Sequence, residues 1–404
     1  MEKPDINAQM QSLLRGAERV YTAEELESRL KEFQSTGRQM RVKFGMDPTA
    51  PDIHLGHSVV LRKLRQFQDL GHKAVLIIGD YTARIGDPTG QNTTRPILST
   101  EQIQANAKTY FEQAGKILDN TPKKLEVCYN SDFLAKLTFA DVLRLAGQMT
   151  VARMLERDTF ALRYKDGVPI GLHEFLYPLM QAYDSVCMQA DVELGGSDQT
   201  FNCLCGRDIQ RNSDQRPQVV MVMPILVGLD GTQKMSKSKG NYVAITDAPS
   251  DMFGKIMSIP DALMSNYFTL LTDMSESKIR DMVDPAKTHP RKAKAQLGRM
   301  IVTQYYDAQA GQAASDEFDR VFAAKENPTD MPEVPVSCDK MGIRELLTSS
   351  GFAASGGEAR RLIEQNAVTI DGEKVNKIDA VVELRSGQVL RVGKRRFGKI
   401  VVKG

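Results

Sequence analysis

Two short segments of the chain carry side chains suited to phosphate chemistry. In the first, His54-Leu-Gly-His57, the histidines are three residues apart and would share one face of a helix. Gly56 between them removes a side chain where something must pack closely. A helix beginning here would also offer free backbone N–H groups and a positive dipole end to an anion.

The second segment, Lys234-Met-Ser-Lys-Ser238, lies far along the chain and is followed by Lys239, in a loop rich in serine and glycine. Mobile ammonium groups suit a polyphosphate whose leaving oxygens gain charge in the transition state. Taken separately, each segment has a plainer interpretation. A solvated basic loop would explain the lysines, and an ordinary helix start or a metal site would explain the histidines, although no third ligand lies nearby.

A third group of polar residues falls on a predicted helix between these segments. Tyr177, Gln181 and Asp184 are spaced four and three residues apart, so they project from one helix face. If that face points inward, it indicates a polar ligand, because buried polar groups require partners. An exposed polar stripe is the alternative.

Strand and helix patterns alternate along the first 240 residues. Strands are expected at 41–44, 73–79, 125–129, 191–194 and 219–226, and helices at 59–70, 137–157 and 172–189. This alternation predicts an α/β fold with a doubly wound, Rossmann-like sheet. Ligands of such sheets bind outside the carboxyl ends of the strands. The segment from Gly45 to His57 begins at such an end, which favours a functional role for the histidines.

The rest of the chain predicts two further domains. Residues 241–325 are mostly helical, and 326–340 contain three prolines and several charges, which predicts an extended linker. Residues 341–404 predict two helices followed by short strands, a small α+β domain. That segment has twelve Lys/Arg against seven Asp/Glu, a net charge of +5 in a chain of net charge +2. An anionic partner or a solvated basic face would explain this excess.

Composition limits the class of protein. With 404 residues, 41% hydrophobic and 26% charged, the chain predicts two or three ordinary domains. No apolar run approaches the roughly 20 residues of a membrane span, and the first residues lack the apolar stretch of a signal peptide. Five cysteines with no CxxC pair argue against a disulfide framework or a zinc site, so a cytoplasmic location without membrane contact is expected.

Together, His54–His57 and Lys234–Ser238 resemble the signature pair of class I aminoacyl-tRNA synthetases. The resemblance to bacterial tyrosyl-tRNA synthetases extends over essentially the whole chain, through Tyr177–Asp184, Ile85-Gly-Asp-Pro-Thr-Gly90, Leu194-Gly-Gly-Ser-Asp-Gln199 and a tail similar to the S4 RNA-binding module. It implies that the protein activates L-tyrosine with ATP to form tyrosyl-adenylate and diphosphate. It also implies transfer of tyrosine to the 3′-terminal adenosine of tRNA-Tyr.

The resemblance also implies roles for single residues. Catalytic roles in stabilising the phosphates fall to His54, His57, Lys234, Lys237 and Thr49. Tyrosine would be bound by Asp87, Tyr177, Gln181, Gln199, Asn130 and Asp184, with Asp184 accepting the hydrogen bond of the phenol. ATP would be bound by Gly45, Asp47, Gly56, Gly196, Asp198 and Lys237, and tRNA by Arg360, Arg361, Lys374, Arg395 and Arg396. Mg²⁺ would bind through the phosphates of ATP, without a dedicated protein metal site. A homodimer is implied, through a helical insertion around 137–190.

Two residues depart from the family pattern. Lys43 stands where many bacterial members carry a tyrosine that grips the phenol, and Gln91 replaces a common lysine. Lys43 either points elsewhere or contacts the phenol oxygen or Asp184.

Three alternative functions compete with this interpretation. A tryptophanyl enzyme would share both signatures, although Asp184 and the basic tail favour tyrosine. A nucleotidyltransferase of the same superfamily would lack the tail. A non-catalytic RNA-binding protein would not need intact histidines and lysines.

Overall fold

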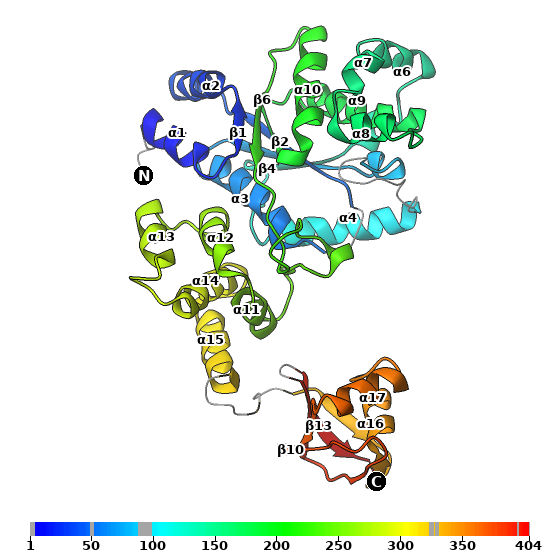
Figure 1. Cartoon of the computed structure of the whole chain (residues 1–404). Coiled ribbons are helices and arrows are strands. Elements are labelled where there is room, and N and C mark those ends of the chain that lie inside the picture. Colours follow the sequence, from blue (N-terminus) through cyan, green and yellow to red (C-terminus); the bar gives the residue numbers. More distant parts are fainter. Residues whose placement is uncertain are drawn as a thin grey trace. The chain divides into compact units, whose positions relative to one another are not determined.

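The computed structural model describes residues 5–48, 52–87, 99–322, 327, 331–393 and 396–403. The chain divides into two compact units, Met1–Gly311 and Gln312–Gly404, and each is described by itself. Figure 1 shows the elements of both units. None of the helices in the described ranges combines the length and apolar character that crossing a lipid bilayer requires.

A six-stranded sheet forms the centre of the first unit, with the strand order β1-β6-β5-β2-β3-β4. Its strands are β1 (Arg19–Tyr21), β2 (Arg41–Met46), β3 (Lys73–Ile78), β4 (Leu125–Tyr129), β5 (Val192–Gly196) and β6 (Val219–Met223). Strands β2 to β6 are parallel, whereas β1 pairs antiparallel with β6. The strand order reverses between β2 and β5, so a ligand crevice is expected at their carboxyl ends.

Helices cover both faces of this sheet, which explains why β3 and β6 consist almost entirely of buried apolar residues. The covering helices are α1 (Ile6–Leu14), α2 (Ala23–Thr36), α3 (Leu55–Asp69), α4 (Thr100–Ala114), α9 (Leu172–Cys187) and α10 (Thr200–Asn212). In the view of Figure 1, α9 and α10 lie above the sheet and α3 lies below it. The predicted doubly wound α/β fold is confirmed, whereas the short antiparallel β1 and the helices α1, α2, α4 and α10 were not among the predicted elements.

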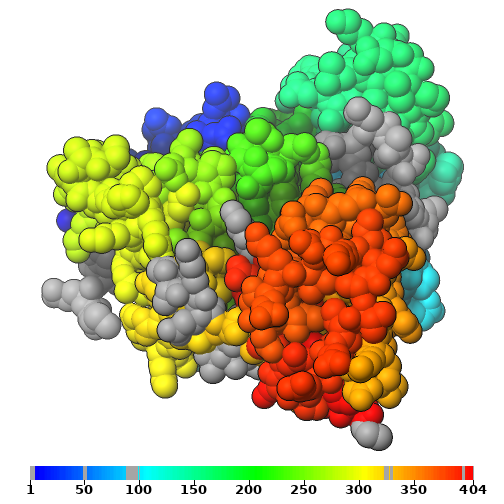
Figure 2. Space-filling view, turned by 60° about the horizontal axis from the view of Figure 1, so that its bottom comes forward, coloured from blue at the N-terminus to red at the C-terminus, as the bar shows by residue number. Residues whose placement is uncertain are grey.

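Between β4 and β5 the chain forms a helical insertion, which Figure 2 shows in green as a projecting lobe. Its helices before α9 are α5 (Ser131–Leu134), α6 (Phe139–Ala146), α7 (Val151–Met154) and α8 (Asp158–Lys165). The expectation of one helix over 137–157 is wrong. Gly147 follows the end of α6, and the Thr150 hydroxyl accepts a hydrogen bond from the Arg153 amide at 3.1 Å, which starts a new helix.

Helices continue after β6, as predicted for 241–325. They are α11 (Pro249–Met257), α12 (Met264–Leu271), α13 (Glu276–Val283), α14 (Pro290–Tyr305) and α15 (Ala308–Phe322).

The second unit is a small α+β domain. It contains β7 (Glu333–Val336), β8 (Lys340–Gly342), α16 (Ile343–Ser349), α17 (Gly356–Glu364), β9 (Val368–Ile370), β10 (Glu373–Lys374), β11 (Val381–Glu383), β12 (Val389–Val392) and β13 (Arg396–Val402). One sheet has the order β10-β9-β12-β13-β7, and β8 pairs with β11. Buried side chains of α16, α17 and the larger sheet, such as Leu346, Ile363 and Leu390, form one core.

The expectation of a linker over 326–340 needs a correction. Its second half contains β7, which pairs in parallel with β13 at the edge of the sheet. Val334 and Val336 are buried with 3% and 4% exposure, whereas Pro335 between them points away. A proline cannot donate to a neighbouring strand, so an edge strand is the position that tolerates it. A proline such as Pro335 is therefore compatible with an edge strand as well as with a linker.

Candidate active site

Polar residues that follow three strands meet at the carboxyl ends of the sheet in the first unit. Asp47 follows β2, Thr82 follows β3 and Asn130 follows β4. The Thr82 hydroxyl donates to Asp47 Oδ1 at 2.7 Å, and Asn130 Nδ2 donates to the Thr82 hydroxyl at 3.0 Å. Gly79 makes this packing possible, because a Cβ there would lie 2.0 Å from Asp47 Oδ1. Sequence reasoning missed Gly79 and Thr82.

Helix α9 closes one side of a cleft over these strands. The Tyr177 hydroxyl donates to Asp47 Oδ2 at 2.8 Å, which joins α9 to the end of β2. Burial and the nearby Asp47 carboxylate raise the pKa of Tyr177 well above its usual value, so the hydroxyl stays protonated and donates. Gly45 is exposed although it lies within a central strand, and a Cβ there would meet nothing within 4 Å. The cleft therefore has open space above Gly45, as expected for a ligand site.

Asp184 lies two helical turns along α9 from Tyr177 and is buried, with 3% exposure. Its Oδ1 has no hydrogen-bond partner within the part of the chain that the structure describes. Burial raises the pKa of Asp184 to about 8, and the Lys43 ammonium opposes that shift. A buried oxygen without a partner is costly, so this atom fits a donor supplied by a ligand. The inward orientation of the polar face predicted on this helix is present.

Asn202, on α10, joins two of the predicted tyrosine-binding residues. Its Nδ2 donates to Gln181 Oε1 at 3.1 Å and to Gln199 Oε1 at 3.0 Å. Gln181 Nε2 in turn donates to Glu193 Oε1 at 3.1 Å. Sequence reasoning missed Asn202, although its position three residues after Gln199 could have placed both on one helix face.

Asp87 has a cationic partner that the sequence did not suggest. Arg157, which is 5% exposed, places a guanidinium nitrogen 2.9 Å from Asp87 Oδ1, and Gln199 Nε2 donates to Asp87 Oδ2 at 2.6 Å. A substrate ammonium at Asp87 would therefore share this carboxylate with Arg157.

The two signature histidines form a stacked pair at the start of α3. Their ring centroids are 3.8 Å apart. His54 Nδ1 accepts from the Gly56 amide at 3.1 Å, and His57 Nδ1 accepts from the His54 amide at 3.3 Å. Because both Nδ1 atoms accept, the proton of each neutral ring lies on Nε2, which can then donate to an oxyanion.

The charge of this pair is set by burial. Burial, helped by the ammonium groups of Lys237 and Lys234, lowers the pKa of His54 to about 3. Burial, helped by the neighbouring His54, also holds the pKa of His57 well below its usual value. Both rings are therefore neutral near pH 7 and act as hydrogen-bond donors without carrying a full positive charge.

The lysine segment lies beside these histidines. His54 forms an isolated bridge with Ala244, and the Leu55 amide donates to the Val243 carbonyl at 3.0 Å. Lys234 Nζ lies 2.5 Å from Asp198 Oδ2, and Lys237 donates to the backbone carbonyl of Asp52. The structure thus brings together the two segments that the sequence suggested for phosphate chemistry. Gly196 is needed there too, since a Cβ would lie 2.6 Å from Asp198 Oδ1.

The chain is similar to known proteins over nearly its whole length. The family model "tRNA synthetases class I (W and Y)" matches residues 34–323, and the model for the C-terminal domain of tyrosine–tRNA ligases matches residues 324–399. The tyrosine–tRNA ligase of Moorella thermoacetica is 52% identical over 399 residues, covering 98% of this chain and 96% of that protein. That of Thermotoga maritima is 52% identical over 395 residues, covering 97% of each. The chain belongs to the tyrosine–tRNA ligase family.

Solved structures agree with this fold. The tyrosyl-tRNA synthetase of Archaeoglobus fulgidus, complexed with L-tyrosine, has a TM-score of 0.61 at 23% identity and covers 77% of this chain and all of that one. The truncated mitochondrial enzyme of Aspergillus nidulans has a TM-score of 0.63 at 21% identity, covering 80% and 95%. The full-length relatives carry the tyrosine name, so the family assignment supports the tyrosine interpretation and not the tryptophanyl alternative.

Some residues of the tyrosine–tRNA ligase pattern do not belong to the strand-end site described above. Thr49, Gln91 and Arg395 fall outside the described residues. Four predicted RNA-binding residues lie exposed in the second unit, namely Arg360 and Arg361 on α17, Lys374 on β10 and Arg396 on β13.

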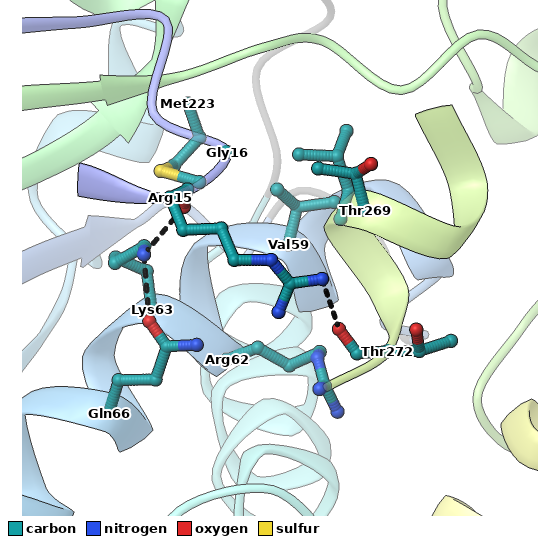
Figure 3. Close-up of a pocket in the computed structure, with 10 residues that line it drawn as sticks. Arg15, Gly16, Val59, Arg62, Lys63, Gln66, Met223, Thr269 and Thr272 are labelled. Atoms are coloured by element: carbon teal, nitrogen blue, oxygen red, sulfur yellow. Dashed lines mark hydrogen bonds between the residues drawn. The ribbon is translucent and has the colours of Figure 1, made fainter. Parts of the chain in front are cut away.

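A separate small cavity of about 20 Å³ shares no residue with the cleft (Figure 3). There Lys63 Nζ donates to the backbone carbonyls of Leu13 and Arg15, at 2.8 and 3.0 Å. Because these carbonyls lie at the end of α1, the lysine caps that helix, which gives it a structural role.

Proposed function

We propose that the chain is a tyrosine–tRNA ligase that activates L-tyrosine with ATP and then esterifies the 3′-terminal adenosine of tRNA-Tyr. The observation on which this rests is the buried Asp184 Oδ1, which has no hydrogen-bond partner among the described residues. It lies on the helix that Tyr177 joins to the end of β2, the strand that His54 and His57 follow. A phenol hydroxyl would donate to that oxygen. The amino-acid carboxylate would then lie toward the mouth of the cleft, where it can attack the α-phosphate.

The histidines and lysines divide the phosphate chemistry between them. The two neutral imidazoles would donate from Nε2 to the oxygens of the α-phosphate, where negative charge accumulates in the transition state. The ammonium groups of Lys234 and Lys237 would bind the oxygens of the leaving diphosphate. In the structure both ammonium groups are held by oxygens of Asp198 and Asp52, contacts that ATP would have to replace.

Mg²⁺ would accompany the phosphates of ATP. No group of three or more His, Cys, Asp or Glu side chains in the described ranges is placed to hold a metal ion. The ion would be held by phosphate oxygens, and its contribution would be to neutralise the charge of the leaving diphosphate. Thr49 would assist at the phosphates.

Transfer RNA would bind through the second unit. Its exposed arginines Arg360 and Arg361 lie on one helix, α17, and would contact backbone phosphates, so charging should be strongly salt-dependent. The cytoplasm, where tRNA is charged, is the proposed location.

The proposed homodimer would form through the helical insertion of the first unit. Seven large apolar side chains there are exposed, among them Phe139 at 78%, Leu143 at 58%, Val151 at 63% and Leu172 at 83%. Exposed apolar side chains in this number on one segment are typical of a protein interface. Leu145 and Met154, from the same segment, are buried against α9 and α10 and pack inside the chain instead.

ATP–pyrophosphate exchange with each of the twenty amino acids tests the proposal. Tyrosine alone should support exchange, and exchange without tyrosine specificity would reject the assignment. For tRNA, the full chain with Arg360→Glu and Arg361→Glu should keep exchange but lose charging by about two orders of magnitude. Lys31→Glu, an exposed cation on α2, is the control that should affect neither activity.

A further inference from the structure

Lys43 lies inside the first unit, two residues before Gly45 on β2, and its side chain is fully buried. Its Nζ donates to the backbone carbonyl of Gln181 at 2.8 Å, to the Ser185 hydroxyl at 2.7 Å and to Glu193 Oε1 at 2.9 Å. An ammonium has three protons, and these partners use all of them. Lys43 thus points to Glu193 and α9, which answers the question that the sequence left open.

Glu193, on β5, is equally buried and fully bonded. Its Oε1 accepts from Lys43 and from Gln181 Nε2, the latter at 3.1 Å. Its Oε2 accepts from the Ser185 hydroxyl at 3.2 Å and from Gln218 Nε2. A buried ion pair is tolerated when every remaining donor and acceptor is satisfied, as here. The pair therefore joins β2, α9 and β5 into one hydrogen-bonded layer.

This layer lies beneath the amino-acid cleft. Helix α9 is fastened to β2 at two places, by the Tyr177–Asp47 hydrogen bond at the strand end and by Lys43 with Gln181 and Ser185 deeper in the unit. The open space above Gly45 lies between these two fastenings along β2. The Lys43 contact therefore fixes how far α9 stands from the strand where a ring would enter.

The same pair also influences the charge of Asp184, the residue next to Ser185, on which burial acts most strongly. Side chains that act on it are Lys43, Glu193, Asp47, Asn130, Tyr177 and Cys187. Lys43 favours the ionised carboxylate, while burial and the carboxylates of Glu193 and Asp47 favour the neutral acid. An ionised Asp184 can only accept a hydrogen bond, which is what a phenol donor needs.

We propose that Lys43 is a positioning residue for phenol recognition. Its ion pair with Glu193 holds α9 at the depth of a phenol ring, and its positive charge favours the ionised form of Asp184, which accepts a hydrogen bond. The proposal rests on the tyrosine–tRNA ligase function and names how the same site distinguishes tyrosine from phenylalanine. Lys43 itself does not touch the substrate.

Two substitutions in the full-length chain should act in opposite directions. Lys43→Met removes the charge that favours the carboxylate, so tyrosine binding should require a higher pH. Glu193→Gln removes a charge that opposes it and keeps the side-chain shape, so the same transition should move to lower pH. Each shift should be about one pH unit. A simple loss of structure would not produce shifts of opposite sign.

The measurement is ATP–pyrophosphate exchange between pH 6 and 9 with tyrosine and with phenylalanine. Near pH 7, Lys43→Met should raise KM for tyrosine about tenfold or more and lower the tyrosine-to-phenylalanine ratio of kcat/KM similarly, while KM for ATP stays near the wild-type value. Arg29→Met is the matched control. Arg29 forms a pair of comparable burial with Asp191, the residue directly before β5. It should lower thermal stability without changing the ratio.

The outcomes separate the two proposals. If the wild-type chain shows no tyrosine-dependent exchange, the proposed function fails. If the wild-type chain is active but the two pH profiles move in the same direction or stay in place, the role of Lys43 is refuted. The same follows if Arg29→Met lowers the tyrosine-to-phenylalanine ratio as much as Lys43→Met. If Lys43→Met does not fold, Glu193→Gln alone tests the role of Lys43. A pH profile of exchange that does not move to lower pH in that variant refutes the role.

Discussion

The replacement Gly56→Ala tests how the two histidines are held. A Cβ at this position would lie 2.9 Å from His54 Cε1 and 3.0 Å from His54 Nδ1. Carbon atoms in ordinary contact are roughly 3.5–4.0 Å apart, so the imidazole would have to move by about 0.5 Å or more. That movement would weaken the hydrogen bond from the Gly56 amide to His54 Nδ1 and displace the Nε2 donor.

Stability and activity should respond differently to this change. Loss of the cap at His54 costs about 1 kcal/mol, while alanine in place of glycine near a helix start contributes up to about 1 kcal/mol. The free energy of unfolding should therefore change by less than about 1 kcal/mol. A misplacement of this order at a catalytic group can cost about 100-fold in rate. We expect kcat for pyrophosphate exchange to fall about 10- to 100-fold, with KM for tyrosine nearly constant.

The matched control is Gly254→Ala. Gly254 lies within α11, and a Cβ there would meet nothing within 4 Å. That variant should gain about 1 kcal/mol of stability and exchange pyrophosphate at the wild-type rate. Urea unfolding and exchange kinetics on both variants complete the test. If Gly56→Ala is as active as Gly254→Ala, the position of the His54 ring does not matter to activation, and the reasoning is refuted.

Three further predictions concern Asp184, His54 and the apolar lobe. Asp184→Ala should raise KM for tyrosine about 10- to 100-fold in pyrophosphate exchange and barely change activity with phenylalanine, because only the phenol loses a partner. The folded-state pKa of His54, about 3, lies below its unfolded value near 6.5, so its contribution to stability is complete above pH 6.5 and is lost as the pH falls towards 3. In urea unfolding, His54→Gln should therefore reduce the slope of the free energy of unfolding against pH, between those two pKa values, by about 1.4 kcal/mol per pH unit. Phe139→Asp with Val151→Asp should convert a dimer to a stable monomer in light scattering, since both side chains are exposed within the chain; an unchanged mass would exclude this interface.

Local signals predicted most of the sheet and the two phosphate-handling segments. Strand β3 is a continuous apolar run whose residues after Lys73 are all buried, the pattern that a parallel sheet covered on both faces imposes. The histidine segment was found because it combines residue type, spacing and position at a strand end. The small C-terminal α+β domain was predicted from two helical segments followed by short strands, features that are also local.

Features that depend on partners distant in sequence could not be predicted. The three residues of β1 become a strand only because β6 offers an unpaired edge. Likewise, Pro335 signalled a linker until β13 supplied a neighbour that makes β7 an edge strand. The break after α6 came from Gly147 and Thr150, whose capping roles were visible in the sequence but were outweighed by the apolar pattern around them.

Side-chain pairing across the unit explains what was missed in the site. Arg157 and Asp87 are 70 residues apart, and Lys43 and Glu193 are 150 residues apart. Nothing near Arg157 or Lys43 in the sequence identifies the carboxylate with which it pairs, because the pairing is set by how α9 and the insertion pack on the sheet. A family pattern assigns a role to each position from the residue usually found there. At Lys43 the usual residue is absent, so its role follows only from the contacts it makes, and those lead to Asp184 through Glu193 and α9.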